Sequence, residues 1–145
     1  MLSLVPNLQI QLIWLDSQMI ELRLSASSEN FCGCANFYAG FSELSDFAEL
    51  LAGFPTSAVD RRTVEFGAKD SPGLGGANIK FFCRDSSGHL VVEVAVLATP
   101  SGTQDLGQSA VVQIDTVPAE IDSFIEQLRG MRSQVGSTAT LKSAR

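Results

Sequence analysis

Hydrophobic and polar residues alternate along much of the chain, and this pattern predicts a protein built mainly from β-strands. In the first stretch, Gln9 and Gln11 separate the apolar residues Leu8, Ile10, Leu12 and Trp14. A second alternating stretch covers residues 20–26, and the turn at Asp16-Ser17 joins the two as a β-hairpin. A third strand is expected over residues 31–39.

The second half of the chain predicts four further strands, over residues 64–68, 79–84, 89–98 and 110–114. The stretch 89–98 is largely apolar on both faces, which is typical of a strand at the centre of a sheet. Two segments rich in turn residues, 70–76 and 99–107, are expected to be loops.

Two segments have apolar residues at helical spacing, so each predicts a helix with one buried stripe. The first begins at Ser42, a residue suited to capping a helix, and stops at Gly53 and Pro55. The second begins near Pro118. The two stripes are Leu44, Phe47, Ala48 and Leu51 in the first helix, and Ile121, Phe124, Ile125 and Leu128 in the second.

The two strand–helix units are similar to one another, because residues 31–54 can be laid on residues 108–131 with their apolar positions aligned. The order of elements is βββα followed by ββββα, with a possible internal pseudo-repeat. We therefore predict an α+β fold, in which one antiparallel sheet of about seven strands carries both helices on one face. A single domain is expected over residues 1–133. Residues 134–145 are small and polar without a pattern, so a flexible C-terminal tail is expected.

The face of this sheet away from the helices is a candidate contact surface. If Ala35 and Phe37 point toward the helices, Tyr38 points away from them. The other side chains expected on that face are Ile13, Leu15, Cys32, Cys34, Asn36, Phe82 and Val91. Such an apolar surface either binds a partner or is covered by sheet curvature or a loop. Trp14 shares its strand face with Leu8 and is expected in the core, so Tyr38 is the better interface candidate.

Charge is unevenly distributed along the chain, whose net charge is −6 and whose pI is near 4.6. Residues 1–60 contain seven acids and one base, whereas residues 61–145 contain nine of each. A nucleic-acid surface needs clustered lysines and arginines, so this balance argues against one. It would suit a basic partner, and surface charge that serves only solubility is the simpler alternative.

The residues that could carry chemistry do not form a recognisable site. Three cysteines and one histidine are the number of ligands that a zinc ion needs, and the chain has Cys32, Cys34, Cys83 and His89. Strand alternation, however, places Cys83 on the opposite face from the other two cysteines. His89 is the only histidine and follows a turn, so we expect a solvated residue rather than part of a catalytic triad. The glycines at 73–76 precede a strand and not a helix, which argues against a phosphate cradle. We predict no catalytic residue, no metal and no cofactor.

The start of the chain lacks the basic segment and cleavage site of a secretion signal. No stretch approaches the ~20 apolar residues that a membrane span needs. We therefore expect a cytoplasmic protein that binds neither membranes nor nucleic acid.

The motif F-x-G-x-A-x-F at 31–37, followed by L-x-x-F-x-x-x-L at 44–51, resembles small bacterial proteins of the immunity-protein type. The strand motif at 85–94 and the F-x-x-x-L of the last helix resemble them too. These families include immunity proteins of polymorphic toxin systems and sister families of unknown function. The resemblance covers most of residues 8–131 and lies in core residues and turns, so it implies a fold and transfers no site residue.

The leading hypothesis is a non-catalytic protein-binding module, such as a toxin-neutralising immunity protein that masks a basic toxin domain with its acidic half. Its candidate contact residues are Tyr38, Glu43, Asp46 and Phe82. One alternative is a small-molecule-binding domain with a pocket between the sheet and the helices or at the 69–76 loop. The others are an enzyme that uses His89 or Cys34, and a protein whose role is structural or is to form homodimers.

Overall fold

The strands form two four-stranded antiparallel sheets, where the sequence predicted one sheet of about seven strands. The computed structural model describes residues 5–67, 75–98, 107–131 and 134–144, and the predicted loops at 70–76 and 99–107 fall largely outside them. Within these residues, sheet A has the strand order β3-β2-β1-β8 and sheet B the order β4-β5-β6-β7. The elements are β1 (Asn7–Leu15), β2 (Ile20–Ser27), β3 (Cys32–Ala39), α1 (Glu43–Leu51), β4 (Arg61–Phe66), β5 (Gly76–Cys83), β6 (Leu90–Ala98), β7 (Gln108–Thr116), α2 (Pro118–Gly130) and β8 (Thr138–Lys142). The α+β class is confirmed.

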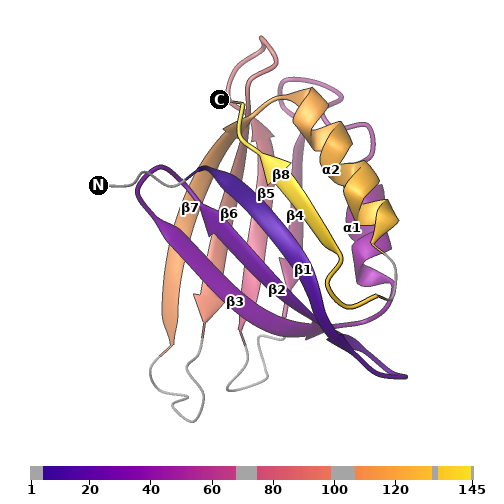
Figure 1. The fold of residues 1–145 in the computed structure, drawn as a ribbon. Helices are drawn as coiled ribbons and strands as arrows, with labels where there is room; N and C mark the ends of the chain where they lie inside the picture. The colour runs from indigo at the N-terminus through magenta and orange to yellow at the C-terminus, as the bar shows by residue number, and fades with distance from the viewer. Residues whose placement is uncertain (1–4, 68–74, 99–106, 132–133, 145) are drawn as a thin grey trace.

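The two sheets face one another, and the helices close one of the open sides between them (Figure 1). Helix α2 contacts β8 at the edge of sheet A, α1 contacts β4 at the edge of sheet B, and the helices pack on each other. This arrangement differs from two helices on one face of a single sheet. Each sheet has one apolar face, and the two faces bury each other across a shared core.

Strand β3 crosses sheet B at close range, and Gly33 makes this approach possible. A Cβ atom at Gly33 would lie 3.3 Å from Cβ of Ala110 and 3.4 Å from Cβ of Val96. Further along β3, the ring of Phe37 stacks on that of Phe66, with ring centroids 5.3 Å apart. The strand therefore crosses from β7 and β6 to β4, and it joins the two sheets into one core.

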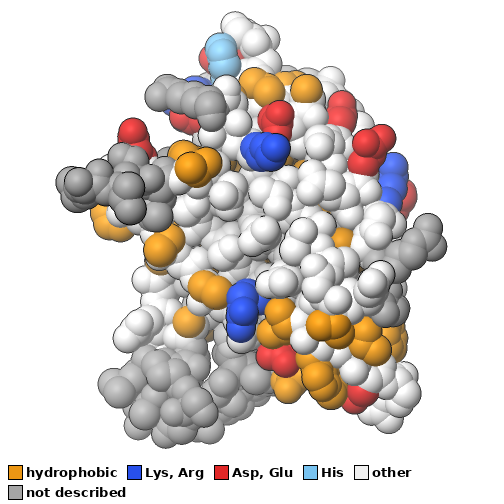
Figure 2. All heavy atoms as spheres, viewed as in Figure 1, with side chains coloured by type: hydrophobic (Ala, Val, Ile, Leu, Met, Phe, Trp, Pro, Cys, Tyr) orange, Lys and Arg blue, Asp and Glu red, His pale blue; other side chains and the backbone are white. Residues whose placement is uncertain are grey.

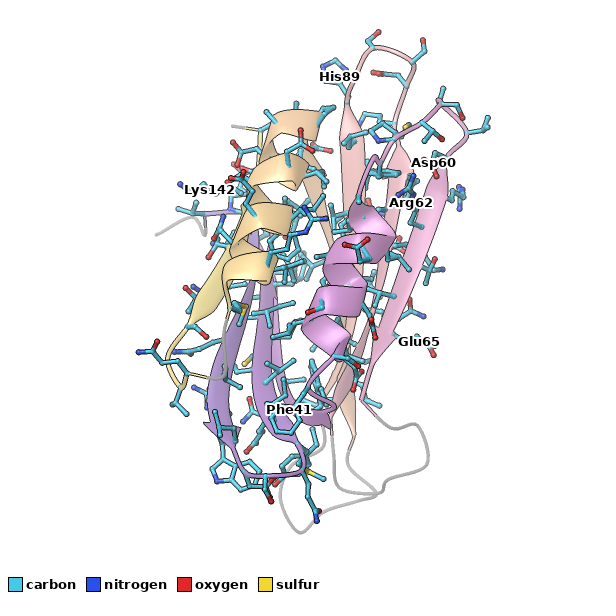
Figure 3. The ribbon with its side chains drawn as sticks, turned by 90° about the vertical axis from the view of Figure 1, so that its right-hand side faces the viewer. Phe41, Asp60, Arg62, Glu65, His89 and Lys142 are labelled. Atoms are coloured by element: carbon cyan, nitrogen blue, oxygen red, sulfur yellow. The ribbon has the colours of Figure 1, made fainter. Side chains whose placement is uncertain are left out.

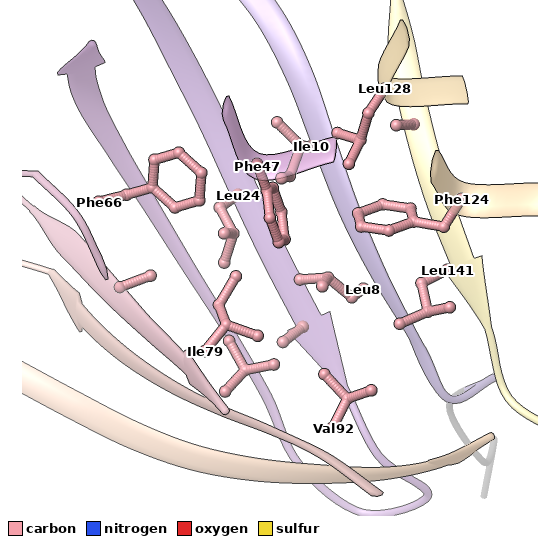
Figure 4. Close-up of a cluster of buried hydrophobic side chains, with 14 of the residues drawn as sticks. Leu8, Ile10, Leu24, Phe47, Phe66, Ile79, Val92, Phe124, Leu128 and Leu141 are labelled. Carbon is pink, nitrogen blue, oxygen red and sulfur yellow. The ribbon is translucent and has the colours of Figure 1, made fainter. Parts of the chain in front are cut away.

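Phe47 of α1 lies at the centre of this core (Figure 4). Its ring is 5.4 Å from that of Phe66, 5.9 Å from that of Phe81 and 5.6 Å from that of Phe124, measured between centroids. These partners belong to β4, β5 and α2. One side chain thus connects both helices to sheet B, and the helical stripes predicted from the sequence are buried as expected.

Residues 138–142 form β8, although the sequence predicted a flexible tail from residue 134 onward. The strand pairs with β1, and its residues Ala139 and Leu141 are fully buried. On its other side the amide of Gln127 in α2 acts like a strand partner. Gln127 donates from Nε2 to the carbonyl of Thr140 at 3.1 Å and accepts from the N–H of Thr140 at 2.9 Å. These contacts hold the strand in place despite its small, polar sequence.

Trp14 is not in the core, because a β-bulge shifts the register of β1 between Leu12 and Trp14. The bulge leaves Leu8, Ile10 and Leu12 buried, as predicted, but turns Trp14 to the outer face, where 42% of its surface is exposed. The prediction for Trp14 was wrong for this reason.

We predict that Gln127→Ala destabilises the fold by about 1–3 kcal/mol, because it removes both hydrogen bonds to the part-buried backbone of Thr140. Thermal and urea unfolding measure the change. Glu126→Ala, one residue away on the exposed face of α2, is the matched control and should have little effect. Equal stabilities for the two variants would contradict the role given to Gln127.

Candidate functional site

The outer face of sheet A is polar along most of its length and aromatic at one end. One cross-strand row contains Gln9, Ser25 and Cys34, and the next contains Gln11, Arg23 and Asn36. The last row contains Trp14, Glu21 and Tyr38. The sequence predicted an apolar outer face, and in sheet A only the end that carries Trp14 and Tyr38 has large apolar side chains on this face among the rows described.

Trp14 and Tyr38 form an edge-to-face pair, with ring centroids 6.0 Å apart and planes at 78°. Glu21 lies between them in the strand register, since it pairs with Trp14 on one side and with Tyr38 on the other. Each of the two residues is 42% exposed. Trp14 and Tyr38 therefore expose aromatic surface to solvent, and Glu21 adds a carboxylate to the same row.

Two further apolar side chains lie at the same end. Met19 belongs to the turn of the β1–β2 hairpin and is 36% exposed, and Phe41 follows β3 and is 46% exposed. We call Trp14, Met19, Tyr38 and Phe41 the aromatic patch. Figure 2 shows hydrophobic side chains gathered over the free end of the hairpin, and Figure 3 places Phe41 at this end of the molecule.

The predicted contact residues Glu43 and Asp46 lie near this patch in the chain, in the first turn of α1. Glu43 has a structural role, because its Oε2 accepts a hydrogen bond of 2.5 Å from the N–H of Gly40. Asp46 is exposed. Tyr38 is also exposed, and it precedes Glu43 by five residues in the chain.

Phe82 does not belong to that region. It lies on sheet B, where it pairs with Arg61 and Val91. The guanidinium of Arg61 lies over its ring, 5.1 Å from the centroid. Asp60, the neighbour of Arg61, is at the opposite end of the molecule from Phe41 (Figure 3). Phe82 is thus half-buried beneath an arginine and apart from the aromatic patch.

Part of the acidity of the N-terminal half stabilises the fold itself. Asp16 accepts hydrogen bonds from the N–H groups of Gln18 and Met19, and Glu49 pairs with Arg129 across the helices at 3.2 Å. The excess charge of residues 1–60 is therefore not a single free surface.

Asp60 and Arg62 form a mostly buried ion pair at the end of α1. Arg62 Nη2 donates to Asp60 Oδ2 at 2.9 Å, and the two side chains are 19% and 12% exposed, respectively. Arg62 Nη1 also donates to the carbonyls of Leu50 and Ala52, at 2.9 and 2.7 Å. The hydrogen bond from Arg62, followed by that from the N–H of Thr56, lowers the pKa of Asp60 to about 2. This cluster satisfies the carbonyls at the helix end and offers no free reactive group.

The groups considered for chemistry remain apart. Cys32 and Cys34 are exposed on β3, whereas Cys83 lies on β5. The described residues contain no cluster of three or more potential metal ligands. His89 Nδ1 lies 2.8 Å from Asp85 Oδ2 in an exposed turn. The hydrogen bond from the N–H of Ser87, followed by that of His89, lowers the pKa of Asp85. Among the described residues, the hydrogen-bond partner of the imidazole ring is Asp85 and not a serine hydroxyl.

Buried hydrophobic side chains lie between the sheets and helices, where the alternative hypothesis placed a pocket (Figure 4). A cavity of about 250 Å³ lies at one end of sheet B, at the residues that flank segment 68–74. The alternative site named at the 69–76 loop falls largely outside the described residues.

Sequence reasoning missed Trp14, Met19, Glu21 and Phe41 as surface residues of interest. A signal was present, because four apolar residues in succession break the alternation of β1, namely Leu12, Ile13, Trp14 and Leu15. Such a break is compatible with a bulge.

Comparisons of the chain with protein-family models, with curated proteins and with solved structures found no match. Among the described residues, no helix is both long and apolar enough to cross a membrane.

We predict that Asp60→Asn lowers stability at neutral pH and weakens its acid dependence. The unfolded carboxyl titrates near 3.8 and the folded one near 2. The ionised group therefore stabilises the fold above pH 3.8, and this contribution is lost as the pH falls toward 2. Urea unfolding of both proteins across this range measures the difference.

Asp122→Asn, at an exposed position of α2, is the control for this measurement. It should follow the wild-type curve. If Asp60→Asn lost stability with the same pH dependence as the wild type, the role of the Asp60 carboxylate would be refuted.

Proposed function

We propose that the chain is a non-catalytic protein-binding module that contacts a basic partner protein through the aromatic patch. The observation that carries the proposal is the exposed Trp14–Tyr38 pair with Glu21 between the two residues in register. Tryptophan and tyrosine often dominate binding energy at protein interfaces, since they bury much apolar area with little loss of conformational freedom.

The chemistry of the patch favours a basic partner. An arginine of the partner could stack on Trp14 and pair with Glu21 at the same time, which combines a cation–π contact with an ion pair. Glu43 and Asp46 would surround such a contact with further negative charge. A basic residue, Arg23, lies in the neighbouring cross-strand row on the same sheet face. Its Nε donates to Asn36 Oδ1 at 3.1 Å.

Neutralisation of a basic toxin domain in the bacterial cytoplasm would be one function of this kind. It needs a binding surface and no catalytic group, in keeping with the separation of His89 from the cysteines. The same surface is too acidic to favour nucleic acid. Homodimer formation through the patch is the competing use, and like charges at Glu21 of two copies would oppose it.

Capture from a bacterial lysate on the tagged chain tests the proposal when wild type is compared with Trp14→Ala/Tyr38→Ala. We expect a basic protein that the wild type retains and the double variant releases, with affinity weakened roughly 30-fold or more. The control is Val59→Ala/Val111→Ala, which truncates two exposed apolar side chains away from the patch and should retain the protein.

Titration of the identified partner at increasing salt tests the electrostatic part. Affinity should fall with salt, and Glu21→Gln should weaken binding and flatten this dependence. Retention of the same proteins by the patch variant would refute the proposal. So would a concentration-dependent dimer, seen by sedimentation, that the patch variant abolishes and no partner protein replaces.

A further inference from the structure

Strand β7 forms one edge of sheet B, and among the described residues no strand pairs with its outer side. Figure 1 shows it as the outermost strand of that sheet. Its stretch 108–114 contains no charged residue and no proline, and its register with β6 has no bulge. Natural proteins usually protect a sheet edge with one of these features. The opposite edge strand, β4, has charged side chains at Arg61, Arg62 and Glu65.

The hydrogen-bond pattern shows which residues of β7 direct their backbone groups outward. In an antiparallel ladder, alternate residues direct both backbone groups to one neighbour and then to the other. The N–H of Arg84 donates to the carbonyl of His89 at 2.8 Å, so this pair bonds between β5 and β6. Counted from it along the register, odd-numbered residues of β6 bond to β5 and even-numbered ones to β7. Ser109, Val111 and Gln113 of β7 therefore direct their backbone groups away from β6.

The contact of Ala144 with this edge agrees with that direction. Its N–H donates to the carbonyl of Asp115, which is in step with Ser109, Val111 and Gln113, at 2.9 Å. Ala144 thus occupies the edge at Asp115, where the free stretch ends. The backbone groups of the other three residues make no hydrogen bond to the rest of the described chain.

These backbone groups are unpaired and lie at exposed residues. The nearby cavity at the end of sheet B differs in this respect, because its unpaired side-chain atom, Oδ1 of Asn78, is buried and is not reached from the cavity. A row of outward N–H and C=O groups on a sheet edge is matched by an added β-strand, which forms main-chain hydrogen bonds along it.

The sequence of the edge selects a second copy of this chain as that strand. Antiparallel pairing of two β7 strands about a two-fold axis at Val111 places Val111 opposite Val111 and Ser109 opposite Gln113. All of these residues direct their backbone groups outward, so each pair exchanges two hydrogen bonds. Polar side chains face polar ones, valine faces valine, and no charges oppose one another. An axis at Ala110 or Val112 would instead place Val111 opposite Ser109 or Gln113.

Pairing would also cover exposed apolar surface without electrostatic repulsion. Val111 is 63% exposed and shares an outer-face row with Ala95, so the apolar row would continue from one copy to the other. Phe31 is 68% exposed and lies two residues before Gly33, where β3 crosses β7 at close range. Residues 61–145, which contain all of sheet B, carry nine acids and nine bases.

We infer that two copies of this chain pair through the outer edges of β7 and join their four-stranded sheets B into one continuous antiparallel sheet. The paired stretch, residues 109–113, is short, so the dimer is weak. It uses no residue of the aromatic patch, which lies on sheet A.

Sedimentation of the full chain, from roughly micromolar to near-millimolar concentration, tests the inference. We expect a monomer–dimer equilibrium. Val111→Pro removes an outward N–H and leaves the ladder with β6 intact, so it should weaken the dimer roughly tenfold or more without loss of the fold. Thr63→Pro is the matched control, because the same counting places its N–H on the outer side of β4. It should dimerise as the wild type does.

A second variant keeps the test independent of proline. Val111→Lys places like charges opposite each other at the axis, so it should also weaken the dimer, and salt should relieve the effect. Circular dichroism and thermal unfolding check that each variant is folded.

Charge pairs test the register. Ser109→Glu/Gln113→Lys places opposite charges across each outer pair and should tighten the dimer at low salt, whereas Ser109→Lys/Gln113→Lys should weaken it. Hydrogen exchange gives a second readout. The N–H groups of Ser109, Val111 and Gln113 should exchange more slowly as the protein concentration rises, whereas that of Val112, which bonds to β6, should not change.

A chain that stays monomeric over the whole range overturns the inference, and so does a dimer that both Val111 variants retain. A dimer lost in Trp14→Ala/Tyr38→Ala would place the interface on sheet A and overturn it too. If the chain is monomeric and Val111→Pro instead releases a different captured protein, the edge binds another chain, and self-pairing is refuted. The aromatic-patch proposal is tested by capture with its own variant, so the failure of one proposal can be told from the failure of the other.

Discussion

The architecture depends on the burial of Phe47, whose ring lies where both helices meet sheet B. Each sheet has one apolar face, and the two faces alone leave a side of the core open to water. Helix α1 closes that side through Phe47, whose ring contacts Phe66, Phe81 and Phe124. Truncation of a buried phenylalanine typically costs about 3–5 kcal/mol, a large part of the stability of a small domain. The core thus explains most of the apolar sequence, and it leaves the outward-facing aromatic residues to be explained otherwise.

Local patterns predicted the elements well, because the period of a strand or helix is a property of neighbouring residues. The hairpin of β1 and β2 and both helical stripes are where the alternation and spacing placed them. Partner choice is not local. Strand β1 pairs with β8 across more than half the chain, and nothing in the period of either strand identifies the other. The division into two sheets could not be predicted from the sequence for this reason.

The candidate site was predicted in part. Tyr38 was assigned to an outer face from simple alternation, and the structure places it there. Trp14 was assigned to the core by the same rule, which fails when one extra residue enters a strand. The unpaired Oδ1 of Asn78 could not be found from sequence at all, because it depends on which way an amide turns toward a neighbouring strand. Backbone geometry and side-chain orientation, which the period of a strand does not record, therefore decide where these groups lie.

The pairing of β1 with β8 also has a consequence for biosynthesis. A ribosome makes Asn7 long before Lys142, yet these residues lie side by side in sheet A. Strand β1 can pair with β2 early, but its other edge has no partner until residues 138–142 have been made, and translation adds residues at about 5–20 per second. During that interval the nascent chain exposes an unpaired strand edge with buried-type side chains, the kind of surface that invites aggregation. Synthesis of β8 is then the event that allows sheet A to be completed.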